Sequence, residues 1–289
     1  MSGALPRTLL VGANGMLGTD LREALRGRDA TIVGRADLDV TDEAAVRAAA
    51  TGHDVIINAA AYTRVDDAES DEATAYAVNA IGARNLAAAA ARHGARLVQV
   101  STDYVFDGRA TSPYPEDAPR DPISAYGRTK AAGEEFVEQI APDRSYIVRT
   151  AWLYGAHGPN FARTMLALAD TKDTWGVVDD QRGQPTWTRD LAQAILSLVD
   201  ADAPAGVYHG TSSGETTWYG FARGVLAASG LDPDRITPTD STAFVRPAPR
   251  PSYSVLGHEA WQRAGLAPIR HWDDALTAAV AAGVLRSGR

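Results

Sequence analysis

The chain has 289 residues, no cysteine, and 28 Lys and Arg against 36 Asp and Glu, which gives a formal net charge of −8. These values exclude disulfides, thiolate metal sites and a cysteine nucleophile, and the acidic balance disfavours a nucleic-acid partner. No apolar run is long enough to span a membrane, and Asp20, Arg22 and Glu23 make the N-terminal segment unlike a secretory signal. We therefore expect a cytoplasmic protein of about two domains.

Short apolar runs alternate with helical stretches in the first half of the chain. In chain order, the predicted elements are strand Thr8–Val11, helix Met16–Arg26, strand Ala30–Val33, helix Asp42–Ala50, strand Asp54–Asn58, helix Asp71–Arg92, strand Arg96–Val100, helix Ser124–Ile140 and strand Tyr146–Arg149. This alternation is typical of βαβ units and a parallel sheet. The expected fold class is α/β, with a Rossmann-type doubly wound parallel sheet in residues 1–151 as the NAD(P)-binding domain.

The second half has a looser rhythm. The predicted elements there are helices Phe161–Ala169, Thr188–Asp200, Thr217–Ser229, Glu259–Ala264 and Trp272–Ala282, strands Val177–Val178 and Val207–His209, and a loop over Pro233–Pro251. We expect residues 152–289 to form mainly a smaller C-terminal α/β substrate domain. Some of its segments are expected to return to the first domain, so that the two are interleaved.

A glycine-rich turn joins the first predicted strand to the first predicted helix. Gly12, Gly15 and Gly18 have the spacing GxxGxxG. Such glycines allow a tight turn and a close approach of the backbone to a pyrophosphate, which the N-terminus of the helix then faces. The pattern predicts a dinucleotide site, and the alternative is a tight βα turn without a ligand.

The end of the second predicted strand indicates which dinucleotide binds. Arg35 stands where NAD-binding folds commonly carry an acidic residue, and Asp39 follows a little later. An arginine can pair with a 2′-phosphate, so Arg35 favours NADPH, with NADH as the alternative. A solvated surface arginine is the other interpretation of this residue.

Tyr126 and Lys130 are four residues apart on a predicted helix and therefore share one face. Reduction of a ketone by hydride needs a proton for the developing alkoxide, which a tyrosine hydroxyl can supply. A nearby ammonium favours the phenolate, and a second hydroxyl, here Thr102 after the fourth strand, can hold the carbonyl oxygen. The alternative is an exposed pair of little energetic consequence.

Taken together, these motifs resemble the extended short-chain dehydrogenase/reductase family. The segment Asn79–Asn85 also matches that family. Within it the chain is similar to the dTDP-4-dehydrorhamnose reductases, on the segments Asn58–Thr63, Val65-Asp66 with Glu69, Ser101–Gly108, Arg149–Gly155, Asp179–Thr186 and Arg250–Leu256. The resemblance covers nearly the whole chain. It implies NADPH-dependent reduction of the C4 keto group of dTDP-4-dehydro-L-rhamnose to dTDP-L-rhamnose.

The resemblance also implies residue roles. Thr102, Tyr126 and Lys130 would be catalytic, with Tyr126 as the proton donor and with Tyr126 and Lys130 also touching the cofactor. The other implied cofactor-binding residues are Gly12, Asn14, Gly15, Met16, Leu17, Gly18, Arg35, Asp39, Val40, Ala59, Ala60, Ala61 and Tyr62. The implied substrate-binding residues are Thr102, Asp103, Tyr104, Trp152 and Asn160, and we add Arg250, because an acidic protein needs local positive charge for two polyanionic ligands.

Several alternatives stay open at this stage. A sibling reductase acting on another dTDP-4-keto-6-deoxyhexose, as in antibiotic deoxysugar synthesis, differs only in the ring face that meets the nicotinamide. A non-catalytic regulatory protein on the same scaffold would bind the cofactor without turnover. Asn79 is interpreted equally as a structural hydrogen-bonding residue or as part of a water relay. Gln184 stands where the family commonly has a small residue, which leaves the edge of the pocket open.

Metal and assembly are the last expectations. The six histidines show no ligand spacing for zinc, and the helix after the glycine turn offers only Asp20 toward the metal-bridged dimers of some family members. We predict no metal, with magnesium as the alternative. The expected partner is a dTDP-sugar, with no nucleic acid and no membrane, for a monomer or a homodimer.

Overall fold

A six-stranded parallel sheet forms the centre of the computed structural model, which describes residues 6–285. Its spatial order is β2-β1-β3-β4-β5-β10, and each neighbouring pair is parallel. The strands are β1 (Thr8–Val11), β2 (Ala30–Val33), β3 (Val55–Asn58), β4 (Arg96–Thr102), β5 (Ser145–Thr150) and β10 (Gly206–His209). The predicted α/β fold with a Rossmann-type sheet is thereby confirmed.

Apolar residues alternate between the two faces of this sheet because successive side chains of a strand point to opposite sides. In β1, Leu10 packs on one face, while Leu9 and Val11 pack on the other. In β3, Ile57 and Ile56 divide in the same way. Both faces are therefore buried, which explains why these strands are continuous apolar runs in the sequence.

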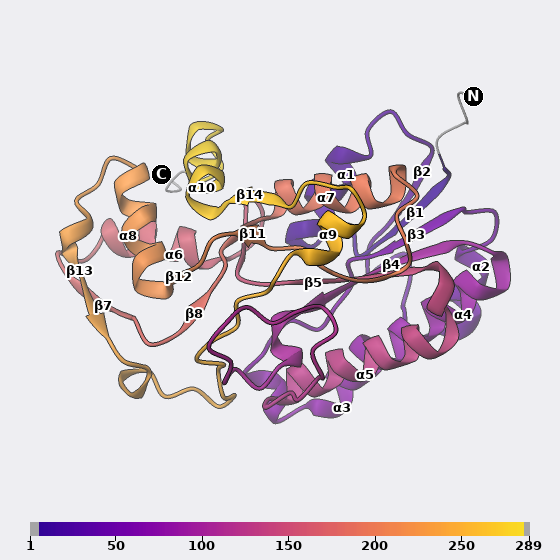
Figure 1. The fold of residues 1–289 in the computed structure, drawn as a ribbon, viewed down its shortest axis with the longest axis horizontal. Coiled ribbons are helices and arrows are strands. Elements are labelled where there is room, and N and C mark those ends of the chain that lie inside the picture. Colours follow the sequence, from indigo (N-terminus) through magenta and orange to yellow (C-terminus); the bar gives the residue numbers. More distant parts are fainter. Residues whose placement is uncertain (1–5, 286–289) are drawn as a thin grey trace.

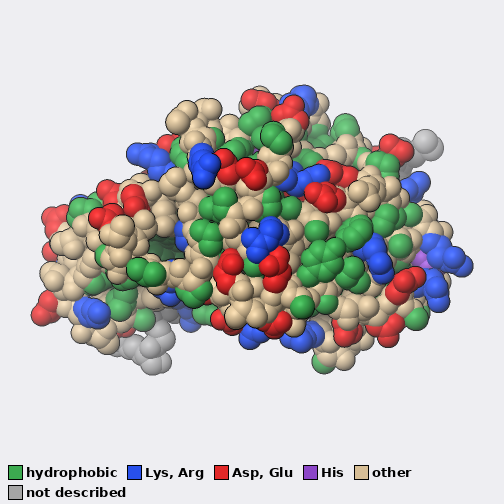
Figure 2. Space-filling view, turned by 90° about the horizontal axis from the view of Figure 1, so that it is seen from below, with side chains coloured by type: hydrophobic (Ala, Val, Ile, Leu, Met, Phe, Trp, Pro, Cys, Tyr) green, Lys and Arg blue, Asp and Glu red, His purple; other side chains and the backbone are tan. Residues whose placement is uncertain are grey.

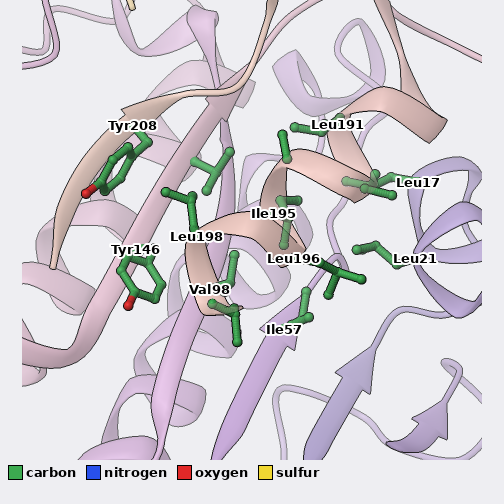
Figure 3. Close-up of a cluster of buried hydrophobic side chains, with 14 of the residues drawn as sticks. Leu17, Leu21, Ile57, Val98, Tyr146, Leu191, Ile195, Leu196, Leu198 and Tyr208 are labelled. Atoms are coloured by element: carbon green, nitrogen blue, oxygen red, sulfur yellow. The ribbon is translucent and has the colours of Figure 1, made fainter. Parts of the chain in front are cut away.

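Helices cover both faces of the sheet (Figure 1). On one face lie α1 (Met16–Ala24) and α7 (Thr188–Asp200), whose leucines and isoleucines interdigitate above β3 and β4 (Figure 3). The other face is covered by α2 (Glu43–Ala49), α4 (Gly82–His93) and α5 (Ala125–Ile140), and α3 (Glu72–Tyr76) packs beside α5. This doubly covered sheet fixes the strand ends on which the site is built.

The predicted helix Asp71–Arg92 is in fact interrupted. The structure has α3, a π-helical turn at Ala77–Ile81 and then α4, which ends at Gly94 in the left-handed conformation (φ +73°). The interruption puts Asn79 on the inside, where it is buried. A π-turn inside a helix is common at functional sites, and an alanine-rich sequence does not reveal it.

The second group of elements packs around its own apolar core of aromatic and aliphatic side chains, seen at the end of the molecule that carries α6 and α8 (Figure 1). Its helices are α6 (Phe161–Ala169), α8 (Trp218–Ala228) and α10 (Trp272–Ala281), whereas α9 (Glu259–Arg263) packs through Ala260 and Trp261 in the core on the α1 and α7 side of the sheet. The short strands of the second half of the chain are β6 (Leu153–Tyr154), β7 (Trp175–Val178), β8 (Arg182–Gly183), β9 (Thr186–Trp187), β11 (Ser212–Ser213), β12 (Thr216–Thr217), β13 (Ile236–Thr239) and β14 (Ile269–His271). Short 3-10 helices lie at Asp67–Glu69 (η1), Asp103–Val105 (η3), Pro142–Arg144 (η4), Pro233–Arg235 (η5) and Ser241–Ala243 (η6).

The prediction of an uninterrupted loop over Pro233–Pro251 was wrong at β13. This strand pairs in parallel with β7 along its length, from Ile236 against Trp175 to Thr239 against Val178. The proline at position 238 and the neighbouring threonines are typical of a loop, so the sequence did not indicate a strand. The partner of this strand lies some 60 residues away in the chain. Tertiary pairing, which local composition does not encode, decided the structure here.

Within residues 6–285, no helix has both the length and the apolar character required to cross a bilayer.

Candidate active site

The chain order of the sheet reverses between β1 and β3, and a cavity of about 740 Å³ lies there. Ligands of open parallel sheets bind at such a switch point, beyond the carboxyl ends of the strands. The cavity is lined by most of the predicted cofactor residues: Gly12, Asn14, Gly15, Arg35, Asp39, Val40, Ala59, Ala60, Ala61 and Tyr62. The other five do not line it: Met16, Leu17 and Gly18 form the first turn of α1, and Tyr126 and Lys130 lie on α5.

Two glycines of the GxxGxxG turn are required by close backbone contacts. Gly12 has φ +82°, and a Cβ there would lie 2.4 Å from the backbone nitrogen of Ala60. A Cβ on Gly18 would lie 2.2 Å from the carbonyl oxygen of Gly12. The turn therefore folds tightly onto itself and onto the segment after β3, which shapes the floor of the cavity.

The N-terminus of α1 fits an anionic group. Its N-cap, Gly15, has no side chain to cap the helix, so the first-turn N–H groups are left for another acceptor. Arg35 and Arg64 also line the cavity. Sequence reasoning missed Arg64, whose guanidinium lies 4.9 Å from the Tyr62 ring centre and 3.3 Å from a carboxylate oxygen of Asp67. A helix N-terminus with two arginines suits a phosphate-rich ligand such as a dinucleotide.

The Asp39 carboxylate is held in its charged form at the cavity. It accepts hydrogen bonds from the Thr41 backbone N–H (2.9 Å) and the Thr41 hydroxyl (2.8 Å). These bonds, together with the charge of Arg35, keep the pKa of Asp39 below its usual range. An acid and an arginine therefore stand together at the position where the adenosine ribose is recognised in this class of fold.

Thr102, Tyr126 and Lys130 come together at the carboxyl end of β4. Thr102 is the last residue of β4, and the other two lie in the first turns of α5. All three side chains are almost completely buried. The start of α5 is fixed by Ser124, whose hydroxyl accepts the Gly127 N–H (3.1 Å).

A carboxylate from outside the helix also caps α5. Glu69 accepts the Ala125 N–H at 2.8 Å. A Cβ at Gly127 would lie 2.2 Å from the Tyr104 carbonyl oxygen, so only glycine allows α5 to approach the segment after β4 so closely. These contacts set the place of Tyr126, whose ring meets the Tyr104 ring edge-on at 5.6 Å.

Burial shifts the pKa of each titratable group in this cluster. Desolvation raises the pKa of Tyr126, which the Thr102 hydroxyl partly opposes. Desolvation lowers the pKa of Lys130 to about 8 and raises the pKa of Asp103 to about 6. The tyrosine therefore holds its proton firmly in this state, as a proton donor must before the reaction.

The hydrogen bonds of the cluster are equally specific. Lys130 Nζ donates to the Val100 carbonyl oxygen at 2.6 Å, and Thr102 Oγ1 donates to Asp103 Oδ1 at 2.9 Å. The second oxygen of the Asp103 carboxyl is buried without a partner. The expected action of Lys130 on the pKa of Tyr126 stays a prediction, because burial, Thr102 and Asp103 set that pKa here.

A second cavity, of about 760 Å³, is lined in part by Tyr104. Its walls are largely aromatic and aliphatic, with two arginines at one end. Residues that line it include Asp66, Tyr104, Phe161, Met165, Trp175, Trp218, Phe244, Arg246 and Arg250. An apolar wall with a few charged groups is the usual construction of a small-molecule site.

Trp152 has the unusual backbone angle φ +46° and stacks on Trp218 with ring centres 3.6 Å apart. A Cβ at Gly183 would lie 2.5 Å from the Trp152 ring, so the ring is packed on that side as well. Trp218 in turn lines the second cavity. Trp152 itself does not line this cavity but supports, by stacking, the Trp218 ring that does, so its substrate role stays a prediction.

Two predicted substrate residues have other partners in this structure. Asn160 caps α6 by accepting the Arg163 N–H at 3.1 Å and donates to the Gly155 carbonyl oxygen at 3.0 Å. Arg250 lines the second cavity but pairs with Asp66 at 2.9 Å. A substrate role for Asn160 or Arg250 stays a prediction.

Asn79 and Gln184 are both buried and take part in structural hydrogen bonds. Asn79 accepts the Tyr62 N–H (2.8 Å) and donates to the Tyr62 carbonyl oxygen (3.1 Å), which favours the structural interpretation over the water relay. The Gln184 amide binds both backbone polar groups of Leu256. Gln184 is thus not an edge of the pocket but a link between two chain segments.

Among the described residues, no group of three or more His, Asp and Glu side chains could hold a metal ion. Asp20 accepts a hydrogen bond from the Thr188 hydroxyl. The expectation that no metal binds stays a prediction, as does the magnesium alternative.

Comparison with known proteins assigns the family. The model described as the RmlD substrate binding domain matches residues 6–284, nearly the whole chain. The chain belongs to this family. Both cavities and the cluster between them therefore lie within the span that the RmlD substrate binding domain family shares.

Individual relatives agree with this assignment. The chain is 52% identical to a dTDP-4-dehydrorhamnose reductase of Streptomyces griseus, over 98% of this chain and 96% of the relative. It is 53% identical to a dTDP-4-keto-6-deoxy-D-glucose reductase of Streptomyces niveus, over 94% and 96%. The crystal structure of a dTDP-4-dehydrorhamnose reductase from Bacillus anthracis in complex with NADP superposes with a TM-score of 0.92 at 36% identity, over 96% of this chain and 99% of that one.

Proposed function

We propose that this member of the RmlD substrate binding domain family is an NAD(P)-dependent oxidoreductase. It would use NADPH to reduce the C4 keto group of dTDP-4-dehydro-L-rhamnose and give dTDP-L-rhamnose. The observation that carries the proposal is the buried cluster of Thr102, Tyr126 and Lys130 next to two cavities. Tyr126 packs in one apolar cluster with Tyr62, which lines the first cavity, and with Tyr104, which lines the second. A hydride donor in one cavity and a keto sugar in the other would meet at its hydroxyl.

Each part of the cluster has a role in this reaction. When bound, NADPH supplies the hydride for C4. Tyr126 gives its proton to the alkoxide that forms on the keto oxygen, and Thr102 holds that oxygen by a hydrogen bond. Lys130 holds the nicotinamide ribose and favours the tyrosinate left after proton transfer. Atoms and charge balance, since one hydride and one proton become the C–H and O–H of the alcohol.

The cofactor assignment rests on the first cavity. The N-terminus of α1 would hold the pyrophosphate, and Arg35 with Arg64 would hold the 2′-phosphate that distinguishes NADPH from NADH. The NADP found in the Bacillus anthracis relative supports the same choice. In the second cavity, Arg246 and Arg250 would offset the diphosphate of the dTDP-sugar.

The decisive experiment combines turnover with product identification. The full chain is incubated with NADPH and dTDP-4-keto-6-deoxyglucose, with and without the 3,5-epimerase, and the loss of NADPH absorbance is followed. We expect turnover that depends on the epimerase and a product that NMR identifies as dTDP-L-rhamnose. Tyr126→Phe is the matched control and should lower turnover by about 100- to 10,000-fold.

Other outcomes point to the alternatives. Turnover without the epimerase, or a product with another configuration at C4, would identify a sibling reductase, for which the Streptomyces niveus relative is the precedent. NADPH binding without turnover would identify a regulatory protein. A cytoplasmic location and a monomeric or dimeric state are part of the proposal, and size-exclusion chromatography with light scattering measures the latter.

A further inference from the structure

A buried ion pair between Glu134 and Arg149 lies one helical turn along α5 from Lys130. Glu134 stands four residues after Lys130 on α5, so the two side chains leave the same face of the helix. Arg149 of β5 donates two hydrogen bonds to the Glu134 carboxylate, from Nε at 3.0 Å and from Nη2 at 2.7 Å. The side chains of Glu134 and Arg149 are 0% and 2% exposed. A charge pair this deep has a large desolvation cost, so its presence calls for a reason other than stability.

The partners of Arg149 hold the pair in one geometry. Its Nη1 donates to the Glu116 carbonyl oxygen (3.1 Å) and lies 3.4 Å from His209 Nε2. His209 Nδ1 is 2.9 Å from the Gly257 carbonyl oxygen and must donate to it, which leaves Nε2 as the acceptor from Arg149. Four of the five N–H groups of Arg149 thus have an acceptor, and Arg120 also donates to Glu134 Oε2 at 3.1 Å, so the Glu134 carboxylate is held in one orientation.

Among the charged groups near Lys130, Glu134 is the one whose charge raises the pKa of the lysine. The titratable or charged groups that α5 and its neighbours bring to this region are Tyr126, Glu134, Glu69, Asp103, Tyr104, Arg120 and Arg149. Burial lowers the pKa of Lys130 to about 8, and the charge of Glu134 acts against it. Burial alone would raise the pKa of Glu134, but Arg149 and then Arg120 keep that carboxyl ionised.

We propose that Glu134, locked by Arg149, is a positioning residue that keeps the buried Lys130 side chain in its ammonium form at the end of β4. From there the ammonium donates to the Val100 carbonyl oxygen and remains available to the ribose and to the tyrosinate. This inference rests on the proposed function for its catalytic consequence. The charge state of Lys130 itself does not depend on that function.

The composition of the chain allows a direct test. Lys130 and Lys172 are its two lysines, and Lys172 is exposed. In the full chain labelled with ¹³C,¹⁵N-lysine, NMR therefore follows Lys130 with Lys172 as an internal reference. We expect Lys130 to titrate near pH 8 in the wild type, and about one pH unit lower in Glu134→Gln, because one opposite charge is lost. Glu134→Asp, which keeps the charge, should restore most of the wild-type value.

Glu138→Gln is the matched control. Glu138 lies one turn further along α5, shares Arg120 as a partner and is 41% exposed, so its loss should leave the titration of Lys130 unchanged. An equal titration of Lys130 in the wild type and Glu134→Gln would overturn the proposal. If Glu134→Gln does not fold, the double variant Glu134→Gln with Arg149→Gln removes both charges of the pair. It should show the same downward shift, because Arg149 is not among the groups that move the pKa of Lys130.

Kinetics give the second readout. In Glu134→Gln the alkaline limb of the kcat profile should move to lower pH together with the Lys130 titration, so that activity falls more at pH 9 than at pH 6.5. A merely structural role would lower kcat by the same factor at every pH, and that result would contradict the proposal. Absence of turnover in the wild type would refute the proposed function, while the NMR titration would still decide the role of Glu134.

Discussion

Tyr126, Lys130 and Asp103 lie in a desolvated space at the end of β4. Burial raises the pKa of Tyr126 and Asp103 and lowers that of Lys130, so it favours the neutral form of each side chain. The raised pKa of the tyrosine means that its proton is retained until negative charge develops on a bound oxygen. The second carboxyl oxygen of Asp103 lies in the same space and has no hydrogen-bond partner. Such unsatisfied groups at a strand end are typical of a site that is completed by its ligands.

Tyr126→Phe tests the proton donor. The variant keeps the ring and its edge-on contact with Tyr104 and loses the hydroxyl. We expect kcat to fall by about 100- to 10,000-fold, the usual range for a positioned general acid, while NADPH binds as before. Stopped-flow turnover and fluorescence titration of NADPH measure the two quantities. A variant that loses NADPH binding as much as turnover would show that the hydroxyl holds the cofactor instead.

Arg35→Gln tests the choice of dinucleotide. A hydrogen bond to a charged group contributes about 1.5–3 kcal/mol, so KM for NADPH should rise by about tenfold to a hundredfold, with KM for NADH unchanged. Arg47→Gln on α2 is the control, since that arginine is exposed and does not line the cavity. Equal effects on the two cofactors would assign the 2′-phosphate to Arg64.

At the scale of elements, the sequence predicts what depends on local pattern and fails where distant segments decide. Alternating apolar runs located β1 to β5, and Asp42 caps α2 by accepting the Ala45 N–H, as its acidic start indicated. The π-turn at Ala77–Ile81 was not predictable, because it depends on the hydrogen bonds of Asn79 to a loop 17 residues away. Arg64 escaped notice for a similar reason, since no motif marks it and only the fold brings it to the cavity.

Gly133→Ala tests the contact between α5 and the π-turn. In an exposed helix interior this change stabilises by about 1 kcal/mol. Here a Cβ would lie 2.4 Å from the Asn79 carbonyl oxygen, so α5 would have to move. We expect the free energy of unfolding to fall by about 1–3 kcal/mol, measured by urea denaturation. Gly224→Ala on α8, whose nearest neighbours are side-chain atoms at 3.2 Å, should be closer to neutral. If Gly133→Ala raised the free energy of unfolding instead, the π-turn would be able to move away from the new Cβ at little cost.

At the scale of the whole molecule, the expected division at residue 151 into a cofactor domain and an interleaved sugar domain stays a prediction. The sheet bears on it, because β10 and α7 come from the second half of the chain and pack with β5 and α1. The net charge is −8, and acidic and basic side chains are interspersed on the face of the molecule shown in Figure 2. Under the proposed function, the local arginines of the cavities would hold the two polyanionic ligands, and the affinity for both should weaken with ionic strength.

Two histidines, the fully buried His209 and the half-buried His258, join the C-terminal segment to the sheet and should make the fold sensitive to acid. His209 contacts the Gly257 carbonyl oxygen, and His258 contacts the Thr211 hydroxyl at 2.9 Å. Desolvation lowers the pKa of His258 to about 4 and that of His209 well below its ordinary value. Between these values and the unfolded pKa of about 6.5, the unfolded chain binds more protons, so stability falls as the pH decreases. Asp103, whose pKa is raised to about 6, acts in the opposite direction below that pH.

His258→Gln isolates one of these protons. Each histidine contributes a slope of up to about 1.4 kcal/mol per pH unit to the free energy of unfolding between its two pKa values. We therefore expect the loss of stability from pH 7 to pH 5, measured by urea denaturation, to be smaller in His258→Gln than in the wild type. His157→Gln, at an exposed position, should keep the wild-type slope. The glutamine amide can still form a hydrogen bond to Thr211, so a difference in slope between His258→Gln and the wild type would report the protonation of His258 rather than the loss of this contact. An unchanged slope in His258→Gln would show that other groups cause the acid sensitivity.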